Sequence, residues 1–294
     1  MSDVYFNADG EYINLEEEVQ KRLKEIHERE RRQKEEWKAK QEGKKRRSKI
    51  SFVNNDMDAV ELMQSALTRA QRGLFVLLTC YLNYDNKLVY YNRGDQPLNK
   101  GDIANVLNCS PSTANEFVNI CIDYGIMRFD EVENAYYVNP SVSFKGGYSN
   151  MERTVVSVKK EVKRLAKALT PTQLGLLYDI QPYINRKYHV LCMNPEETRW
   201  EYVQQQELKP ASLARELGMD EKHLNKQLAK MKVDGKMVVQ KIGYGKKCRY
   251  LVNPNFIFRG DFNKAVETIR TMYNEKTFNT IFSEVRGGDE SASK

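Results

Sequence analysis

The sequence predicts a mainly α-helical protein with small β-hairpins, of the α+β class, in which two tandem winged helix-turn-helix domains follow a long charged helix. Three features predict this fold: a helix–turn–helix–hairpin pattern late in the chain, an earlier repeat of that pattern, and a nearly continuous charged stretch before both. We expect five segments: a charged N-terminal helix with a basic arm at 1–50, a first winged-helix domain at 51–149, a linker helix at 150–168, a second winged-helix domain at 169–262, and a C-terminal helix with a disordered tail at 263–294.

The late pattern lies between residues 208 and 253. Apolar residues recur at helical spacing up to Gly218, a residue type at which helices commonly stop in the left-handed conformation. Asp220 is a good N-cap for a second helix. Two apolar runs, 237–239 and 250–252, then read as strands joined by a glycine-containing loop. This order is the winged-helix arrangement, whose second helix can enter a DNA major groove.

Positive charge gathers on the same pattern. Between Asp220 and Arg249 the chain carries nine Lys or Arg residues and three acidic ones. A solvated lysine-rich helix would explain the helix but not the equally basic hairpin loop. Lysine can reach phosphate or guanine, and Asn and Gln can pair with adenine. The candidate DNA-binding residues are Lys222, His223, Asn225, Lys226, Gln227, Lys230, Lys241, Tyr244, Lys246, Lys247 and Arg249.

Three sequence blocks occur twice in the same order, which predicts tandem copies of one unit. L-T-x-x-Q-x-G-L stands at 67–74 and again at 169–176. V-N-P-x-x-x-F-[KR]-G stands at 138–146 and again at 252–260. Between these blocks Leu98, Ile103, Ala104, Leu107 and Asn115 match Leu208, Leu213, Ala214, Leu217 and Asn225.

The two copies differ in charge. Residues 68–148 hold seven basic and eight acidic residues, whereas residues 169–262 hold fifteen and ten. In the first copy the helix after Ser110 has no Lys or Arg, and the hairpin loop carries Asp130, Glu131 and Glu133. Phosphate would be repelled there. We expect the first copy to be an interaction or dimerisation module, or a weak reader held on DNA by its neighbour.

Three other segments allow more than one interpretation. Residues 1–14 are either a disordered tail or a docking peptide, and the cluster Lys44, Lys45, Arg46 and Arg47 is either a DNA-binding arm or a solvated hinge. In the linker, Val155, Val158, Val162, Leu165 and Leu169 form one apolar seam at helical spacing. We favour docking of this seam on a winged helix over a seam between two chains.

Several classes of protein are not expected. The chain has no run of about twenty apolar residues for a membrane span, and its first thirty residues lack the apolar core of a signal peptide. Five scattered cysteines indicate reduced thiols rather than disulfides or a zinc finger. Tyr244 lacks the activating neighbours that a nucleophile needs. We therefore expect a cytoplasmic protein with no enzymatic activity, cofactor or metal.

The repeated V-N-P-x-x-x-F-[KR]-G block carries a resemblance. Residues 138–146 and 252–260 resemble the strand that closes the winged helix of replication initiators and related regulators from plasmids and phages of Gram-positive bacteria. This resemblance implies the cytoplasm or nucleoid of a bacterial host as the location. Those proteins look like single-copy forms, so the tandem arrangement departs from their pattern. Tandem winged helices are also similar to a second class of plasmid initiators. That resemblance implies a dimerising first copy and a second copy that contacts origin repeats through Lys222, Asn225, Lys226 and the loop 244–247.

Three functions stay open at this point. The first is a phage or plasmid replication initiator that binds double-stranded origin repeats and recruits replication proteins. The second is a transcription regulator of such an element, working with the transcription machinery at a promoter. The third is a protein–protein adaptor, since winged helices serve all three roles. A homodimer through the first copy or through the 151–169 helix fits any of them.

Overall fold

The computed structural model describes residues 5–6, 12–13, 51–90, 94–146, 153–243 and 248–273. The chain forms two compact units, residues 1–50 and residues 51–294. In the first unit, strand β1 (Tyr5–Phe6) pairs antiparallel with β2 (Tyr12–Ile13). The predicted charged helix and the candidate arm Lys44–Arg47 lie outside the described residues.

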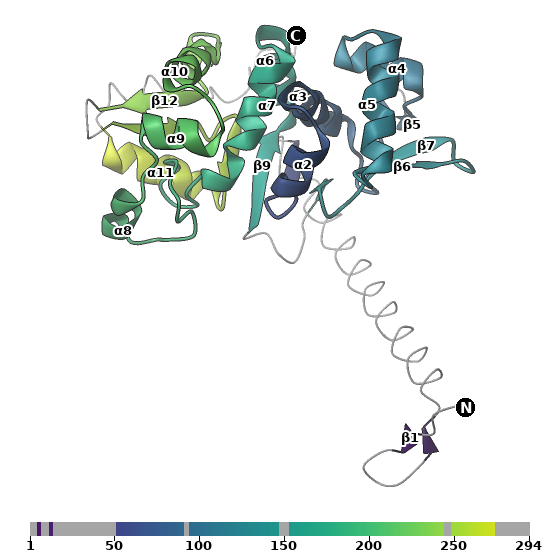
Figure 1. Ribbon diagram of the computed structural model, residues 1–294, viewed down its shortest axis with the longest axis horizontal. Helices are drawn as coiled ribbons and strands as arrows, with labels where there is room; N and C mark the ends of the chain where they lie inside the picture. Colours follow the sequence, from purple (N-terminus) through teal and green to yellow (C-terminus); the bar gives the residue numbers. More distant parts are fainter. Residues whose placement is uncertain are drawn as a thin grey trace, which may run out of the picture. The chain divides into compact units, whose positions relative to one another are not determined.

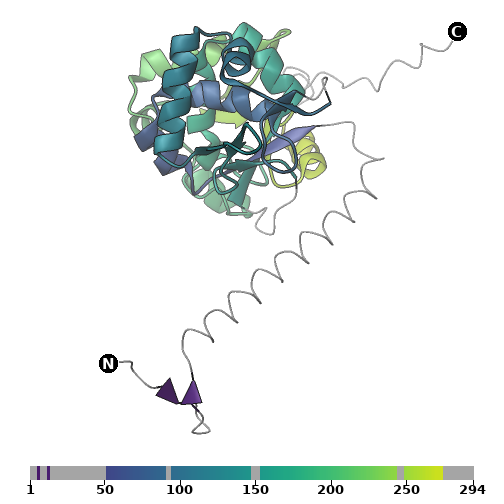
Figure 2. The same ribbon diagram turned by 90° about the vertical axis from the view of Figure 1, so that its right-hand side faces the viewer.

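The second unit is a mixture of helices and small antiparallel sheets, as the predicted α+β class requires. It contains two halves with a similar order of elements, which Figure 1 shows on either side of a shared centre; Figure 2 shows the same unit with the first half in front of the second. The first half contains β3 (Phe52–Asp56), α2 (Val60–Ala66), α3 (Arg69–Leu78), η1 (Thr79–Tyr81), β4 (Val89–Tyr90), β5 (Gln96–Pro97), α4 (Lys100–Leu107), α5 (Pro111–Asp123), β6 (Met127–Asp130), β7 (Ala135–Val138) and β8 (Ser143–Phe144).

The second half repeats this order with additions. It contains β9 (Thr154–Val158), α6 (Lys159–Ala168), α7 (Pro171–Asp179), η4 (Gln181–Tyr183), α8 (Trp200–Gln205), α9 (Pro210–Glu216), α10 (Glu221–Lys230), β10 (Lys232–Val233), β11 (Lys236–Met237), β12 (Val239–Ile242), β13 (Arg249–Val252), β14 (Ile257–Arg259) and α11 (Phe262–Met272). In each half a helix–turn–helix is followed by an antiparallel hairpin, β6–β7 or β12–β13. The assignment of each half to the winged-helix fold stays a prediction.

A four-stranded antiparallel sheet of order β14-β9-β3-β8 joins the halves. Asn54 of β3 lies opposite Phe144 of β8, and Val156 of β9 lies opposite Phe258 of β14. The two pairs occupy equivalent positions in the two copies of the repeat, so each outer strand pairs with its inner strand in the same register. The sheet is therefore pseudo-symmetric about the β3–β9 pairing, and the aromatic residue of each V-N-P block lies in an outer strand.

The linker prediction is wrong for its first part, because residues 154–158 form strand β9 rather than a helix. The β-branched run T-V-V-S-V suits a buried strand, and pairing with β3 outweighs the helical spacing of the valines. The helix itself, α6, begins at Lys159. Val162 is buried in the core of the first half and Leu165 in that of the second. The seam thus packs within the chain, and these two side chains are not exposed to a second copy.

Helices α3 and α7 cross at the two glycines of the repeated L-T-x-x-Q-x-G-L block. A Cβ at Gly73 would lie 1.8 Å from the Pro171 carbonyl oxygen, and a Cβ at Gly175 would lie 1.7 Å from the Arg69 carbonyl oxygen. Both helices start with a capping box, in which Thr68 pairs with Gln71 and Thr170 with Gln173. The repeated block therefore encodes a backbone-to-backbone contact between the halves.

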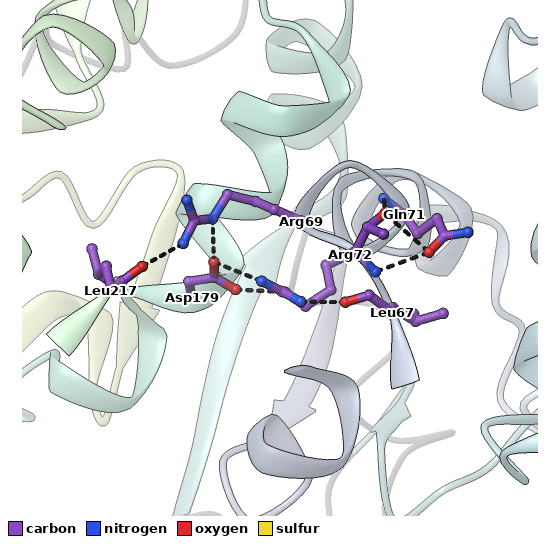
Figure 3. Close-up of polar contacts among 7 residues, drawn as sticks. Leu67, Arg69, Gln71, Arg72, Asp179 and Leu217 are labelled. Carbon is purple, nitrogen blue, oxygen red and sulfur yellow. Dashed lines mark hydrogen bonds and ion pairs between the residues drawn. The ribbon is translucent and has the colours of Figure 1, made fainter. Parts of the chain in front are cut away.

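A buried ion-pair cluster lies beside this crossing (Figure 3). Asp179 is 1% exposed and accepts hydrogen bonds from Arg69 Nε at 2.7 Å and from Arg72 Nε and Nη2 at 2.6 and 2.9 Å. Arg69 also donates from Nη2 to the Leu217 carbonyl oxygen at 2.8 Å. The arginines come from the first half and the acceptors from the second, so the cluster fixes one half on the other.

Helix α11 closes the second half. Its Ile269 is fully buried in a small core with Val190, Val203 and Leu251. The predicted tail lies largely beyond Tyr273, outside the described residues. Among the described residues, no helix has both the length and the apolar character that crossing a membrane requires.

Candidate nucleic-acid interface

The helix–turn–helix of the second half forms for local reasons that the sequence indicates. Gly218 has a φ of +59°, so it ends the first helix in the left-handed region. Asp220 caps α10, because its carboxylate accepts from the His223 backbone N–H at 2.9 Å. Leu224 and Leu228 are buried on the inner face of α10. The opposite face of this helix is left to solvent.

Three lysines form a ridge along that outer face. Lys222, Lys226 and Lys230 are four residues apart and all exposed. Successive lysines are separated by about 6 Å along the helix axis. None forms an ion pair with another of the described residues. Like charges at this spacing destabilise a helix by a few tenths of a kcal/mol per pair, roughly. An anion placed along the ridge would remove that cost.

A groove of about 480 Å³ separates α10 from β12. Its sides carry Lys222 from the helix and Lys241 from the strand. The remaining lining residues are Asn225, Leu228, Ala229, Met237, Val239 and Tyr250. The groove thus combines an apolar floor with cationic rims, an arrangement that the sequence alone did not predict.

The two candidate amides are engaged inside the protein. Asn225 accepts from the Tyr250 hydroxyl at 2.7 Å and donates to the Glu221 carbonyl oxygen at 3.0 Å. The Gln227 oxygen accepts from Gln173 Nε2 at 3.1 Å. An amide that pairs with adenine needs its oxygen and its nitrogen at the same time. In this conformation both oxygens are occupied, so the lysines are the better placed DNA contacts.

The other candidates are divided between the surface and the fold. His223 is exposed, and its Nε2 lies 3.3 Å from Gln227 Nε2. Arg249 is 20% exposed, lies 3.3 Å from the buried carboxylate of Glu207 and covers the ring of Trp200. Its guanidinium therefore stabilises the second half rather than facing a ligand. Tyr244, Lys246 and Lys247 lie outside the described residues.

The first half has a groove beside the equivalent hairpin strands, but it is lined by the start of α4 and the end of α5 rather than by residues along the recognition-helix position. Phe129 pairs with Tyr136 in the first hairpin, and Lys241 pairs with Tyr250 in the second. Because Tyr136 and Tyr250 are equivalent residues of the repeat, Phe129 occupies the position of Lys241. The groove measures about 380 Å³. Its lining residues are Asn99, Lys100, Ile122, Phe129, Asn134 and Tyr136. Helix α5 exposes Ser112, Thr113, Asn115, Glu116 and Asn119, none of which is basic. An anionic ligand is disfavoured here.

The V-N-P block itself has a structural role in both halves. Asn139 Nδ2 donates to the Gly125 carbonyl oxygen at 3.0 Å, and Asn253 Nδ2 donates to that of Met237 at 3.1 Å. Arg259 is 1% exposed, donates to the Ile184 carbonyl oxygen and pairs with Glu196. Burial lowers the pKa of this guanidinium to about 10. The block that carries the family resemblance thus maintains the fold.

Sequence reasoning missed the residues that connect this surface to the crossing helices α3 and α7; of these residues, only Arg69 belongs to the first half. The bond from Arg69 to the Leu217 carbonyl oxygen reaches the turn between α9 and α10. Gln173 of α7 holds Gln227 of α10. Arg69 and Gln173 both belong to the repeated L-T-x-x-Q-x-G-L segments. The repetition of these segments was the signal in the sequence, because two equivalent helices can pack against each other.

Comparisons with protein-family models, with curated proteins and with solved structures find no match to this chain.

Proposed function

We propose that the protein is a sequence-specific double-stranded DNA-binding protein with two tandem winged helices, of which the second contacts DNA. One observation carries this proposal: the ridge Lys222–Lys226–Lys230 lies on the exposed face of the second helix of a helix–turn–helix, with Lys241 across the adjoining groove. A helix in this position can enter the major groove while the hairpin lies along the backbone. Lysine can donate to phosphate oxygens and to guanine O6 and N7.

Within this class we propose a phage or plasmid replication initiator that binds origin repeats. The support is the resemblance of the two V-N-P blocks to initiators, together with a charge difference that suits DNA contact by the second half and protein contact by the first. Transcription control at a promoter is the alternative function. A purely protein-binding adaptor would need an acidic protein surface opposite the lysine ridge.

Removal of the ridge tests DNA binding directly. Lys222→Ala, Lys226→Ala and Lys230→Ala together should weaken binding to duplex DNA at least tenfold at moderate salt. The slope of log affinity against log salt should fall by about one for each lysine that contacts a phosphate. Fluorescence anisotropy with a labelled duplex, at several salt concentrations, measures both quantities.

The matched control removes exposed lysines elsewhere, in Lys100→Ala with Lys264→Ala. These positions lie on α4 and α11, and their loss should change affinity and slope little. Equal effects of the two variant sets would contradict the assignment of DNA contact to α10.

Footprinting across the gene of this protein and its flanks, at two salt concentrations, separates the biological roles. Several phased protected repeats would support replication initiation. A single protected site at a promoter would support transcription control instead. No protection at either salt would reject the DNA-binding proposal and favour an adaptor.

A further inference from the structure

The hairpin β6–β7 of the first half ends in an apolar residue between two acids. Val132 is 96% exposed, with Glu131 before it and Glu133 after it. The Asp130 carboxylate accepts from the backbone N–H groups of Val132 and Glu133, both at 3.1 Å, and so holds the turn in shape. The hairpin tip, residues 131–133, is thus an ordered turn that exposes an apolar side chain to solvent.

The charge of this tip is negative after its internal ion pairs are considered. Arg128 pairs with Asp130, and Lys87 pairs with Glu133. Glu131 is exposed and has no ion pair among the described residues. The tip therefore presents an exposed valine with at least one uncompensated carboxylate beside it.

The groove between α10 and β12 has the complementary character. Its floor includes Leu228, Met237 and Val239, and its rims carry Lys222 and Lys241. A groove of about 480 Å³ can take one branched apolar side chain such as that of Val132. Lys222 and Lys241 would then lie near the carboxylates that flank this valine. Apolar contact would supply stability, and the opposite charges would align the tip and speed association.

The tip and the groove of one chain cannot meet. Figure 1 shows hairpin β6–β7 at one end of the 51–294 unit and α10 with β12 at the other, with α3, α7 and the shared sheet between them. A contact between tip and groove therefore joins two copies. Since it uses different surfaces on the two partners, it is head-to-tail and can continue from copy to copy.

We propose that copies of this chain associate head to tail, with the β6–β7 tip of one copy in the α10–β12 groove of the next. The groove is also the surface assigned to DNA, so the acidic tip competes with duplex DNA; this competition rests on the proposed function, whereas the association does not. A tip in a groove is a small contact, so association appears at high protein concentration and weakens with salt.

Two full-length variants test the association. The tip variant is Glu131→Lys with Val132→Ser, and the groove variant is Lys222→Glu with Lys241→Glu. All four side chains are exposed, so both variants should fold. The mass of the parent protein, measured by sedimentation velocity, should rise with concentration beyond a dimer. Each variant alone should associate at least tenfold more weakly.

The decisive sample is an equal mixture of the two variants. The tip variant retains its groove and the groove variant retains its tip, so the mixture should form a one-to-one dimer and nothing larger. The matched control is Glu61→Lys with Leu62→Ser, which changes an exposed acid and the exposed apolar residue that follows it on α2. This control should associate like the parent. A parent of constant mass, or a mixture that stays monomeric, would overturn the proposal.

Sonicated duplex DNA separates this inference from the proposed function. Duplex should dissociate the parent assemblies, bind the tip variant at least as well as the parent, and bind the groove variant poorly. A dimer in the mixture without DNA binding by any form would retain the association and reject the DNA-binding proposal. DNA binding by a protein whose mass does not change with concentration would support the DNA-binding proposal and reject the association.

Discussion

Among single residues, the repeat allows each residue of one half to be compared with the residue at the equivalent position of the other half. His189 and Asn86 hold equivalent positions, with φ values of +57° and +59°. Each carbonyl oxygen accepts a backbone N–H from the last strand of its hairpin, from Val252 and from Val138, both at 2.9 Å. The same backbone position is thus occupied by a titratable residue in one half and by a neutral one in the other.

His189 should make the protein sensitive to acid. The ring is fully buried, and burial lowers its pKa from 6.5 to about 4. Between these values the unfolded chain binds more protons than the folded chain, so stability falls as pH falls from 6.5 towards 4. The loss should reach on the order of 3 kcal/mol at the acid end.

His189→Asn should remove this contribution, since asparagine tolerates the left-handed conformation and does not titrate. Urea unfolding at a series of pH values measures the effect. An unchanged acid response in the His189 variant would contradict a neutral buried ring.

At the scale of elements, the crossing of α3 and α7 depends on two glycines. Gly73→Ala or Gly175→Ala would place a methyl group within 2 Å of a backbone carbonyl oxygen, so the helices must separate. We expect a loss of about 3 kcal/mol or more in the free energy of unfolding. Gly101→Ala on α4 is the control and should stay within about 1 kcal/mol of the parent. Denaturant titration measures all three, and an unaffected Gly73 variant would show that the crossing is loose.

The same elements show how far sequence reasoning reached. Apolar spacing with Gly218 and Asp220 predicted the second helix–turn–helix and its caps, because these are local signals, and the repeated blocks extended the prediction to the first half. Strand β9 was predicted as helix because its valines fit helical spacing, and its partner β3 lies about a hundred residues earlier. At the site, the lysines followed from composition. The hydrogen bond of Asn225 to the Tyr250 hydroxyl did not, because it requires β13 to fold back against α10.

At the scale of the whole molecule, the two halves share structure that should make them unfold together. Helix α6 places Val162 in one core and Leu165 in the other, and the central sheet takes two strands from each half. The Asp179 cluster adds ion pairs between the halves. Loss of one half would expose apolar surface on the other, so we expect the described part of the chain from residue 51 to residue 273 to unfold as one cooperative unit.

The Asp179 cluster provides the test of this cooperativity. Asp179→Leu leaves Arg72 buried without its carboxylate, so it should cost about 3–5 kcal/mol. In the repeat, Arg72 corresponds to Leu174 and Asp179 to Leu77, so the double variant Arg72→Leu with Asp179→Leu copies the apolar pair at the equivalent positions. The double variant removes the buried unpaired charge of Arg72. Arg69 also loses its carboxylate, but it is 24% exposed and keeps its bond to the Leu217 carbonyl oxygen, so most of the loss should be recovered.

Calorimetry should show one shared unfolding transition in the parent and in both variants. Its midpoint temperature should be lower in the single variant and largely restored in the double variant. The calorimetric and van't Hoff enthalpies of this transition should agree. Two separated transitions in the single variant would mean that the halves are independent bodies. A double variant as unstable as the single would mean that the arginine and the aspartate contribute packing rather than charge, and the buried ion pair would then not be what holds the second half on the first.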